Sequence, residues 1–96
     1  MTLEQLGEFD VIHCSTEEQA NILCKMMHEA GLCWSSGEEY VDNKWYMYYS
    51  RMCYRPFTGT FGNKKFYEED EDNFNIIEFE DFFKQTSCKF MKRMTK

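Results

Sequence analysis

A strand followed at once by an amphipathic helix, between residues 9 and 31, constrains the fold more than any other feature of the sequence. Residues 9–14 read FDVIHC, a short run with β-branched side chains that is typical of a strand. Apolar side chains then recur at the spacing of one helix face, which predicts a helix over residues 16–30. The members of this stripe are Ala20, Leu23, Cys24 and Met27. Because both elements have an apolar side to bury, we expect a helix packed on a sheet.

Both ends of the predicted helix have capping signals. Ser15 and Glu18 have the spacing of a capping box, in which the hydroxyl accepts from the third helical N–H and the carboxylate reaches back. Gly31 suits the left-handed residue that commonly follows a helix, and Leu32 can pack back on the last turn. The sequence therefore predicts where this helix begins and where it ends.

Three further strands are predicted after the helix, in residues 44–54, 60–68 and 74–79. The first is the aromatic run KWYMYYSRMCY, whose alternating large side chains are typical of a strand covered on both faces. Short connections predict antiparallel meander pairing of the three, and the helix crossover lets the first strand join the same sheet. We expect a two-layer α+β domain: one main helix on a largely antiparallel sheet of three or four strands, in the order β-α-β-β-β. Four apolar residues are compatible with a short additional helix in residues 81–94, namely Phe82, Phe83, Phe90 and Met91.

The chain of 96 residues is long enough for one small domain, with residues 1–7 and 92–96 expected to fray. No apolar run reaches the length of a membrane span, and the N-terminal residues lack the basic and apolar regions of a secretory signal. Five cysteines, an odd number without paired spacing, favour free thiols over a disulfide framework. Together these features predict a protein of the reducing cytoplasm.

The net charge of −6 argues against direct nucleic-acid binding, which requires an excess of positive charge. The charge is unevenly distributed, because residues 67–83 contain acidic side chains and no basic one, whereas the charged side chains of residues 84–96 are all basic. The acidic residues are Glu68, Glu69, Asp70, Glu71, Asp72, Glu78, Glu80 and Asp81. A dense anionic surface can imitate nucleic-acid phosphates and occupy a basic groove, and its steering is fast and salt-sensitive. The alternative is a charged surface that keeps an aromatic-rich protein soluble.

Metal ligation is a minor alternative. Cys24 and His28 are four residues apart on one helix face, a spacing that lets two ligands meet one ion. His13, Cys14 and Cys33 flank the same helix and could complete a zinc site. No paired CxxC spacing supports this, and free cysteine is among the most buried residue types. We therefore predict ordinary buried thiols and no cofactor, with a small zinc-stabilised interaction protein as the alternative.

No sequence motif points to catalysis. No cysteine has a neighbouring glycine-rich nucleophile turn, and the acidic run is more typical of a solvated loop than of an acid–base pair. Residues 59–62 lack the Lys-Ser/Thr of a phosphate-binding loop. We expect a protein that binds rather than an enzyme.

The aromatic run is the second candidate contact surface. Tyrosine, tryptophan, methionine and arginine are enriched at protein interfaces, and aromatic side chains with a few cations can also stack on a nucleotide. The residues expected to contribute contact area are Tyr46, Tyr48, Tyr49 and Arg51. A core strand with tyrosines at its rim is the alternative, and an aromatic pocket that sequesters a nucleotide messenger is the second functional hypothesis.

Several segments together resemble small proteins encoded by phages and prophages of low-GC Gram-positive bacteria. These are VIHC ending a strand, TEEQA opening a helix, GLCW followed by SSG, the WY…CY aromatic strand and the final NIIEFEDF. The resemblance covers about three quarters of the chain and implies an accessory factor that antagonises host defence. We expect a non-catalytic, phage-encoded inhibitor of a host antiviral effector, in particular an anti-CRISPR protein that acts in the cytoplasm of the infected bacterium. Its partner would be a protein with a basic nucleic-acid-binding surface, such as a Cas nuclease.

Overall fold

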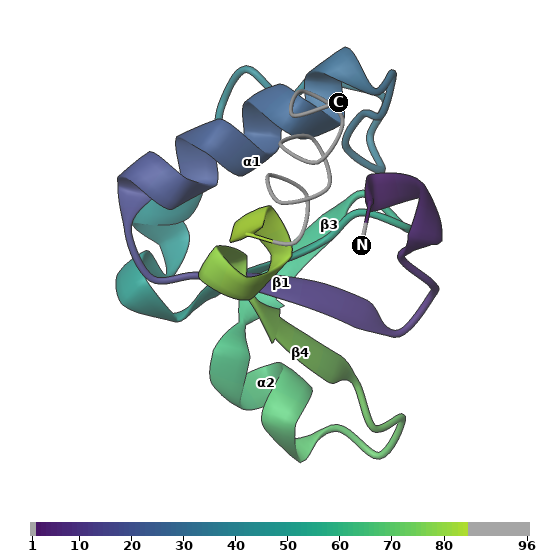
Figure 1. The fold of residues 1–96 in the computed structure, drawn as a ribbon. Helices are drawn as coiled ribbons and strands as arrows, with labels where there is room; N and C mark the ends of the chain where they lie inside the picture. Colours follow the sequence, from purple (N-terminus) through teal and green to yellow (C-terminus); the bar gives the residue numbers. More distant parts are fainter. Residues whose placement is uncertain (1, 85–96) are drawn as a thin grey trace, which may run out of the picture.

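The computed structural model describes residues 2–84 and shows an α+β fold in which helices lie on both sides of a four-stranded mixed sheet (Figure 1). The strands are β1 (Asp10–Cys14), β2 (Met52–Arg55), β3 (Thr60–Asn63) and β4 (Asn75–Glu78). The helices are α1 (Glu17–Glu29) and α2 (Lys64–Glu69), with short 3-10 turns η1 (Leu3–Gln5), η2 (Trp45–Met47) and η3 (Tyr49–Arg51). Residues 79–84 are also helical. The predicted class, one main helix on a small sheet, is confirmed.

The order of strands in the sheet is β3-β2-β1-β4, which places β1 at the centre. β1 pairs antiparallel with β2 and β2 pairs antiparallel with β3, but β4 pairs parallel with β1. The predicted meander of the last three strands is therefore wrong at its final step. The physical reason is α2, because this helix returns the chain across the sheet and delivers β4 to the free edge of β1 instead of β3.

α1 forms where its apolar stripe predicts it, and the whole stripe is buried. The cap is one residue later than predicted: Thr16 is the N-cap and accepts from the Gln19 N–H at 3.2 Å. Gln19 replaces Glu18 in the reciprocal role, since its side-chain carbonyl accepts from the Ser15 N–H. At the other end, Gly31 has φ +83°, and Leu32 N–H donates to the Met27 carbonyl, as in a Schellman motif.

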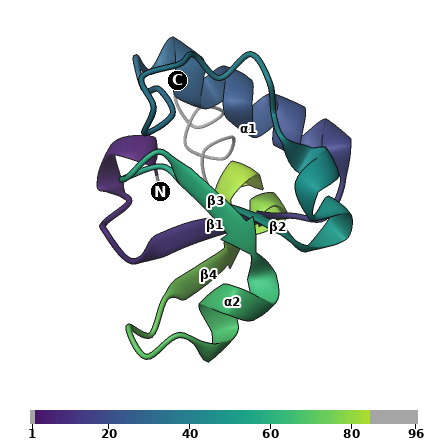
Figure 2. The same cartoon turned by 180° about the vertical axis from the view of Figure 1, so that it is seen from behind.

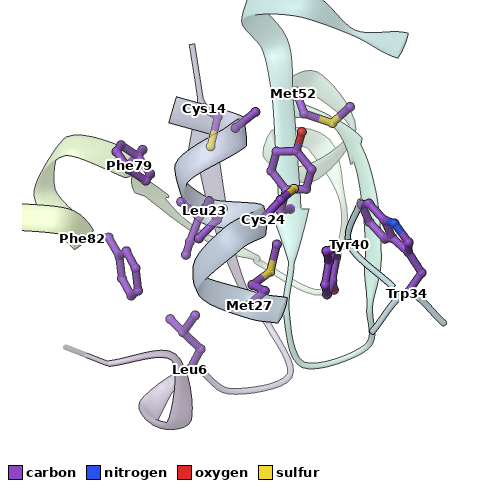
Figure 3. Packing of buried hydrophobic residues seen from close by; sticks show 13 residues of the cluster. Leu6, Cys14, Leu23, Cys24, Met27, Trp34, Tyr40, Met52, Phe79 and Phe82 are labelled. Carbon is purple, nitrogen blue, oxygen red and sulfur yellow. The ribbon is translucent and has the colours of Figure 1, made fainter. Parts of the chain in front are cut away.

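The main core lies between the sheet and α1 (Figure 3). Ile12 and Cys14 of β1 and Met52 and Tyr54 of β2 face the helix stripe, and residues 79–84 add Phe79 and Phe82. Figure 3 shows Phe82 beside Leu23 and Leu6. Leu6 is buried, so part of the segment expected to fray contributes to this core.

On the opposite side of the sheet, α2 is the helix that covers the strands in the described part of the chain (Figure 2). A small second cluster there contains Val11, Cys53 and Tyr67, with Phe74 and Ile76 half-buried beside it. Gly62 allows the close approach of α2, because a Cβ at this position would lie 3.1 Å from the Tyr67 ring. Within the described residues, no helix is long and apolar enough to cross a membrane.

Residues 44–54 are not one aromatic strand, which corrects the prediction. Only the last part enters the sheet as β2, and the preceding residues form η2 and η3. Lys44 and Tyr49 have φ values of +56° and +50°, which no strand accommodates. The Tyr54 hydroxyl donates to the Asn43 carbonyl and the Trp45 indole donates to the Cys14 carbonyl, so tertiary contacts hold this segment as turns.

The predicted strand over residues 60–68 is also only partly correct. β3 ends at Asn63, which caps α2 by accepting from the Lys65 N–H at 2.9 Å. An asparagine cap followed by KKFYEE, which lacks β-branched side chains, starts a helix in preference to extending the strand. The short terminal helix predicted within residues 81–94 is present in its described part, and residues 92–96 lie outside the described residues.

Candidate functional site

The acidic segment forms the end of α2 and the connection to β4, and it protrudes at one end of the molecule (Figure 1). Its carboxylates are Glu68, Glu69, Asp70, Glu71 and Asp72. Asp70 is half-buried and accepts from the Asp72 N–H at 2.8 Å, and the other four residues are exposed. Within residues 2–84 no lysine or arginine forms an ion pair with any of them. Their mutual repulsion therefore has no internal compensation from the described part of the chain.

Phe66 and Phe74 flank this segment in the chain, and Phe9 contacts Phe74. Phe66 on α2 is 57% exposed and Phe9 before β1 is 41% exposed. Phe74 packs edge-on against Phe9, and the Arg55 guanidinium lies 4.8 Å from the centre of the Phe74 ring. We call this region the acidic–phenylalanine surface and define it as residues 68–72 with Phe9, Phe66 and Phe74. The exposed phenylalanine rings beside an anionic segment make this region the candidate contact surface.

The sequence analysis does not identify the three phenylalanines. The strand expected over residues 60–68 places Phe66 where a neighbouring strand could cover it. In α2, Phe66 and the buried Tyr67 project in different directions, so one of them remains exposed. The Asn63 cap is the signal that could have revealed this, because it marks a helix start.

The remaining acidic residues lie apart from this surface, near the other end of β4. Glu78 is paired with His13 and Lys64, at 2.7 and 3.5 Å. Glu80 accepts from Gln19 at 3.4 Å, which ties it to the start of α1. Asp81 is exposed on the adjoining helical turn and lines a small cavity with Glu80. The eight carboxylates expected to share one electrostatic face therefore form two separate groups.

The predicted tyrosine surface lies in η2 and η3, on the far side of the molecule from the acidic segment in both views (Figures 1 and 2). Tyr46 and Tyr49 are exposed, and so is Arg51. Tyr48 is half-buried and packs toward the main core, so it offers less contact area than predicted. Met47, which the sequence does not single out, is half exposed beside them.

His13 is a buried polar side chain near these surfaces, with 7% of its area exposed. Its Nδ1 lies 2.7 Å from Glu78 Oε1 and its Nε2 lies 2.6 Å from the Ser50 carbonyl oxygen. The Ser50 carbonyl can only accept, so Nε2 is the donor in that contact. His13 thus connects β4 to η3, and its contact with Glu78 occupies one oxygen of that carboxylate.

The five zinc candidates are not brought together. Cys14 and Cys24 lie in the main core, His13 faces the opposite side of the sheet, and His28 and Cys33 are exposed. Within residues 2–84 no three potential ligands form a group able to hold a metal ion. Burial raises the pKa of the Cys24 thiol to about 12 and that of Cys14 further still, which disfavours the thiolate that zinc requires.

A surface cavity of about 380 Å³ lies at a third place, between the turn after α1 and the β2–β3 turn. Its walls are formed by Trp34, Ser35, Ser36, Glu38, Lys44, Gly59, Thr60 and Phe61. The cavity combines two aromatic rings, three hydroxyls and one charge of each sign. The sequence predicts an aromatic nucleotide pocket in residues 44–54. Of the residues that line this cavity, only Lys44 belongs to that run.

Comparisons with known proteins give no further assignment. No family model matches the chain, and no curated protein or solved structure matches it either.

Proposed function

We propose that this protein is a non-catalytic inhibitor, encoded by a phage, that binds a host antiviral effector such as a Cas nuclease. The acidic–phenylalanine surface occupies a basic region of that effector that otherwise holds nucleic acid. It acts in the cytoplasm of the infected bacterium, where the effector operates. The phage source and the class of effector come from the resemblance of the sequence, whereas the choice of binding surface rests on the geometry of α2 and its neighbours.

The observation that carries the proposal is the protruding run of carboxylates without an ion-pair partner among residues 2–84. Most surface charges cost little because water solvates them, but a contiguous run of one sign repels itself and creates a strong local field. A basic partner removes that repulsion on binding. Phe66 and Phe9 would then supply apolar area at the centre of the contact, where binding energy concentrates.

Chemistry by a cysteine nucleophile has no support in the described residues. Burial raises the pKa of Cys53 to about 12, as it does for Cys24, and neither thiol reaches the surface. Cys33 is exposed, but no histidine forms a hydrogen bond with it among the residues described. The exposed thiol therefore has no histidine base beside it in the described range.

The test is charge reversal of the acidic segment in a triple variant that combines Glu69→Lys, Asp70→Lys and Glu71→Lys. Wild-type protein, expressed in bacteria whose Cas nuclease targets a phage, should restore plaque formation by that phage. The triple variant should lose this protection, and its affinity for the purified nuclease should fall at least about a hundredfold, or about 2.7 kcal/mol. The salt dependence of binding should also decrease.

The matched control combines Glu4→Lys, Glu29→Lys and Glu39→Lys, which changes the net charge equally at exposed positions outside the segment. This control should protect the phage nearly as well as wild type. Equal loss in both triple variants would show that net charge alone matters, and unchanged inhibition by the segment variant would overturn the mimicry. Failure of the wild-type chain to restore plaques in every CRISPR-immune host would contradict the effector class.

A further inference from the structure

The cavity beside Trp34 is built from two tight turns that are locked together. The Ser35 N–H donates to the Gly59 carbonyl at 2.9 Å, and the Trp34 N–H donates to the Glu38 carbonyl at 2.8 Å. Gly59 has φ +71°, and a Cβ there would lie 2.6 Å from the Cys33 carbonyl oxygen, so only glycine fits. The walls are therefore fixed by backbone contacts and do not depend on flexible side chains.

The cavity offers two kinds of recognition side by side. The half-buried Phe61 ring provides an aromatic wall, and the buried Trp34 ring lies behind it, edge to face with Phe61 at 5.5 Å and packed against Tyr40 at 4.3 Å. Lys44 lies with its Nζ 5.7 Å from the Trp34 ring centre and forms no ion pair with any residue in the described range. The hydroxyls of Ser35 and Thr60 are on the same lining. An aromatic wall next to an unpaired cation suits a ligand that is planar at one end and anionic at the other.

Trp34 supplies an independent observation. Its side chain is only 5% exposed, and its indole Nε1 is buried without a hydrogen-bond partner in the described part of the chain. A buried donor without an acceptor is energetically costly. Trp34 also lines the cavity, so a ligand bound there lies next to this ring and should change its surroundings.

We propose that this cavity binds a mononucleotide, with the base against Phe61 and the phosphate beside Lys44. The volume of about 380 Å³ lies near the lower end of the roughly 300–1,000 Å³ typical of ligand sites, which suits one nucleotide better than two. The Ser35 hydroxyl and the Glu38 carboxylate, which accepts from the Ser36 hydroxyl at 3.2 Å, supply polar atoms for the base edge and the ribose. This site is separate from the acidic–phenylalanine surface, so the proposal of nucleotide binding does not depend on the proposed inhibitor function.

The experiment is calorimetric titration of the full chain with AMP, GMP, CMP and UMP, and with their nucleosides and inorganic phosphate. At least one mononucleotide should bind with a Kd in the micromolar to low millimolar range. Its nucleoside and phosphate alone should each bind at least about tenfold more weakly, because each makes only half of the contacts. Absence of binding by all four mononucleotides, or equal binding by phosphate alone, would overturn the proposal.

The site is located by Lys44→Asn, which removes the cation at a left-handed position that asparagine tolerates. The variant should weaken nucleotide binding at least about tenfold. Lys65→Asn, an exposed lysine on α2, is the matched control and should bind like wild type. Unchanged binding by Lys44→Asn, or equal weakening in both variants, would contradict the assigned cavity.

Tryptophan fluorescence tests the location of the bound nucleotide without any substitution at Lys44. The chain has two tryptophans, so Trp45→Phe leaves Trp34 as the single reporter. Nucleotide should change the emission of Trp34 with the same Kd as the calorimetric titration. Saturable binding without any change in Trp34 emission would place the ligand elsewhere and overturn the site.

Discussion

On one side of the sheet, α1 and residues 79–84 close over a continuous core, whereas on the other side the six residues of α2 cover a much smaller cluster. On the α1 side, side chains such as Leu23, Ile12 and Tyr54 are fully buried. On the α2 side, Phe74 and Ile76 remain half-buried and Phe66 is exposed. The same sheet is thus a closed interface on one face and a partly open one on the other.

This difference has a physical origin in the length of the chain. A domain of 96 residues has enough apolar surface to complete one core but not two. The face that is completed stabilises the fold, and the face left partly open has apolar rings available to a partner. The protruding acidic segment lies at the open face, where its carboxylates are solvated.

The largest expected effect is on stability, and it separates the two faces directly. Leu23→Ala removes a fully buried side chain from the α1 side and should lower the free energy of unfolding by about 3 kcal/mol. Phe66→Ala on the α2 side should change it by less than about 1 kcal/mol, since the ring is mostly exposed. Urea denaturation followed by circular dichroism measures both. Similar losses for the two variants would contradict the division into a closed and an open face.

A smaller effect is expected at the contact between β4 and η3. Glu78→Gln keeps the shape of the side chain but removes the charge opposite His13 and Lys64. The loss should be about 1 kcal/mol, because the Glu78 side chain is 46% exposed and solvent screens part of the interaction. Glu80→Gln, close to it on an exposed turn, should cost less than about 0.5 kcal/mol. Equal losses of stability in the two variants would mean that the pairing of Glu78 with His13 does not stabilise the fold.

The smallest effect concerns local opening and leaves global stability unchanged. Among the described cysteines only Cys33 is exposed, so in native protein at about pH 8 a thiol reagent should label it before the other three described cysteines. Cys53 on the α2 side and Cys14 on the α1 side are both buried, and burial raises the pKa of each thiol above its usual value. In mild urea Cys53 should label faster than Cys14, because its face is less covered. Peptide mass spectrometry measures the rates, and the reverse order would contradict the comparison.

Local signals in the sequence were sufficient for α1 and for much of β1. The apolar stripe, the glycine at position 31 and the hydroxyl cap act over a few residues, so their effect does not depend on the rest of the chain. Even there the cap lies one residue later than expected, at Thr16 and not Ser15, because Gln19 rather than Glu18 completes the hydrogen bonds. Adjacent serine and threonine offer two similar caps, and local sequence alone does not choose between them.

The aromatic run illustrates what local signals miss. Alternating aromatic residues suit a strand, but the contacts of Tyr54 with Asn43 and of Trp45 with Cys14 hold residues 45–51 as turns. Both partners are distant in the sequence or lie outside the run. A propensity counted along the chain does not include such hydrogen bonds, so tertiary context overrides it.

The candidate sites divide in the same way. The acidic segment was visible in the sequence, since a run of like charges has no stable place in a core. Its phenylalanine neighbours were not, because Phe9, Phe66 and Phe74 belong to three separate segments. The Trp34 cavity also joins distant turns, which meet through the backbone contact of Ser35 with Gly59.

By itself the sequence determined the fold class, the main helix with its buried stripe and the position of the exposed negative charge. These follow from periodicity, capping and solvation, which act over one or two turns of chain. Only the tertiary structure decided the parallel pairing of β4 with β1, the separation of the acidic residues into two groups and the cavity beside Trp34. Each of these depends on which distant segments become neighbours, and that is settled by packing of the whole domain.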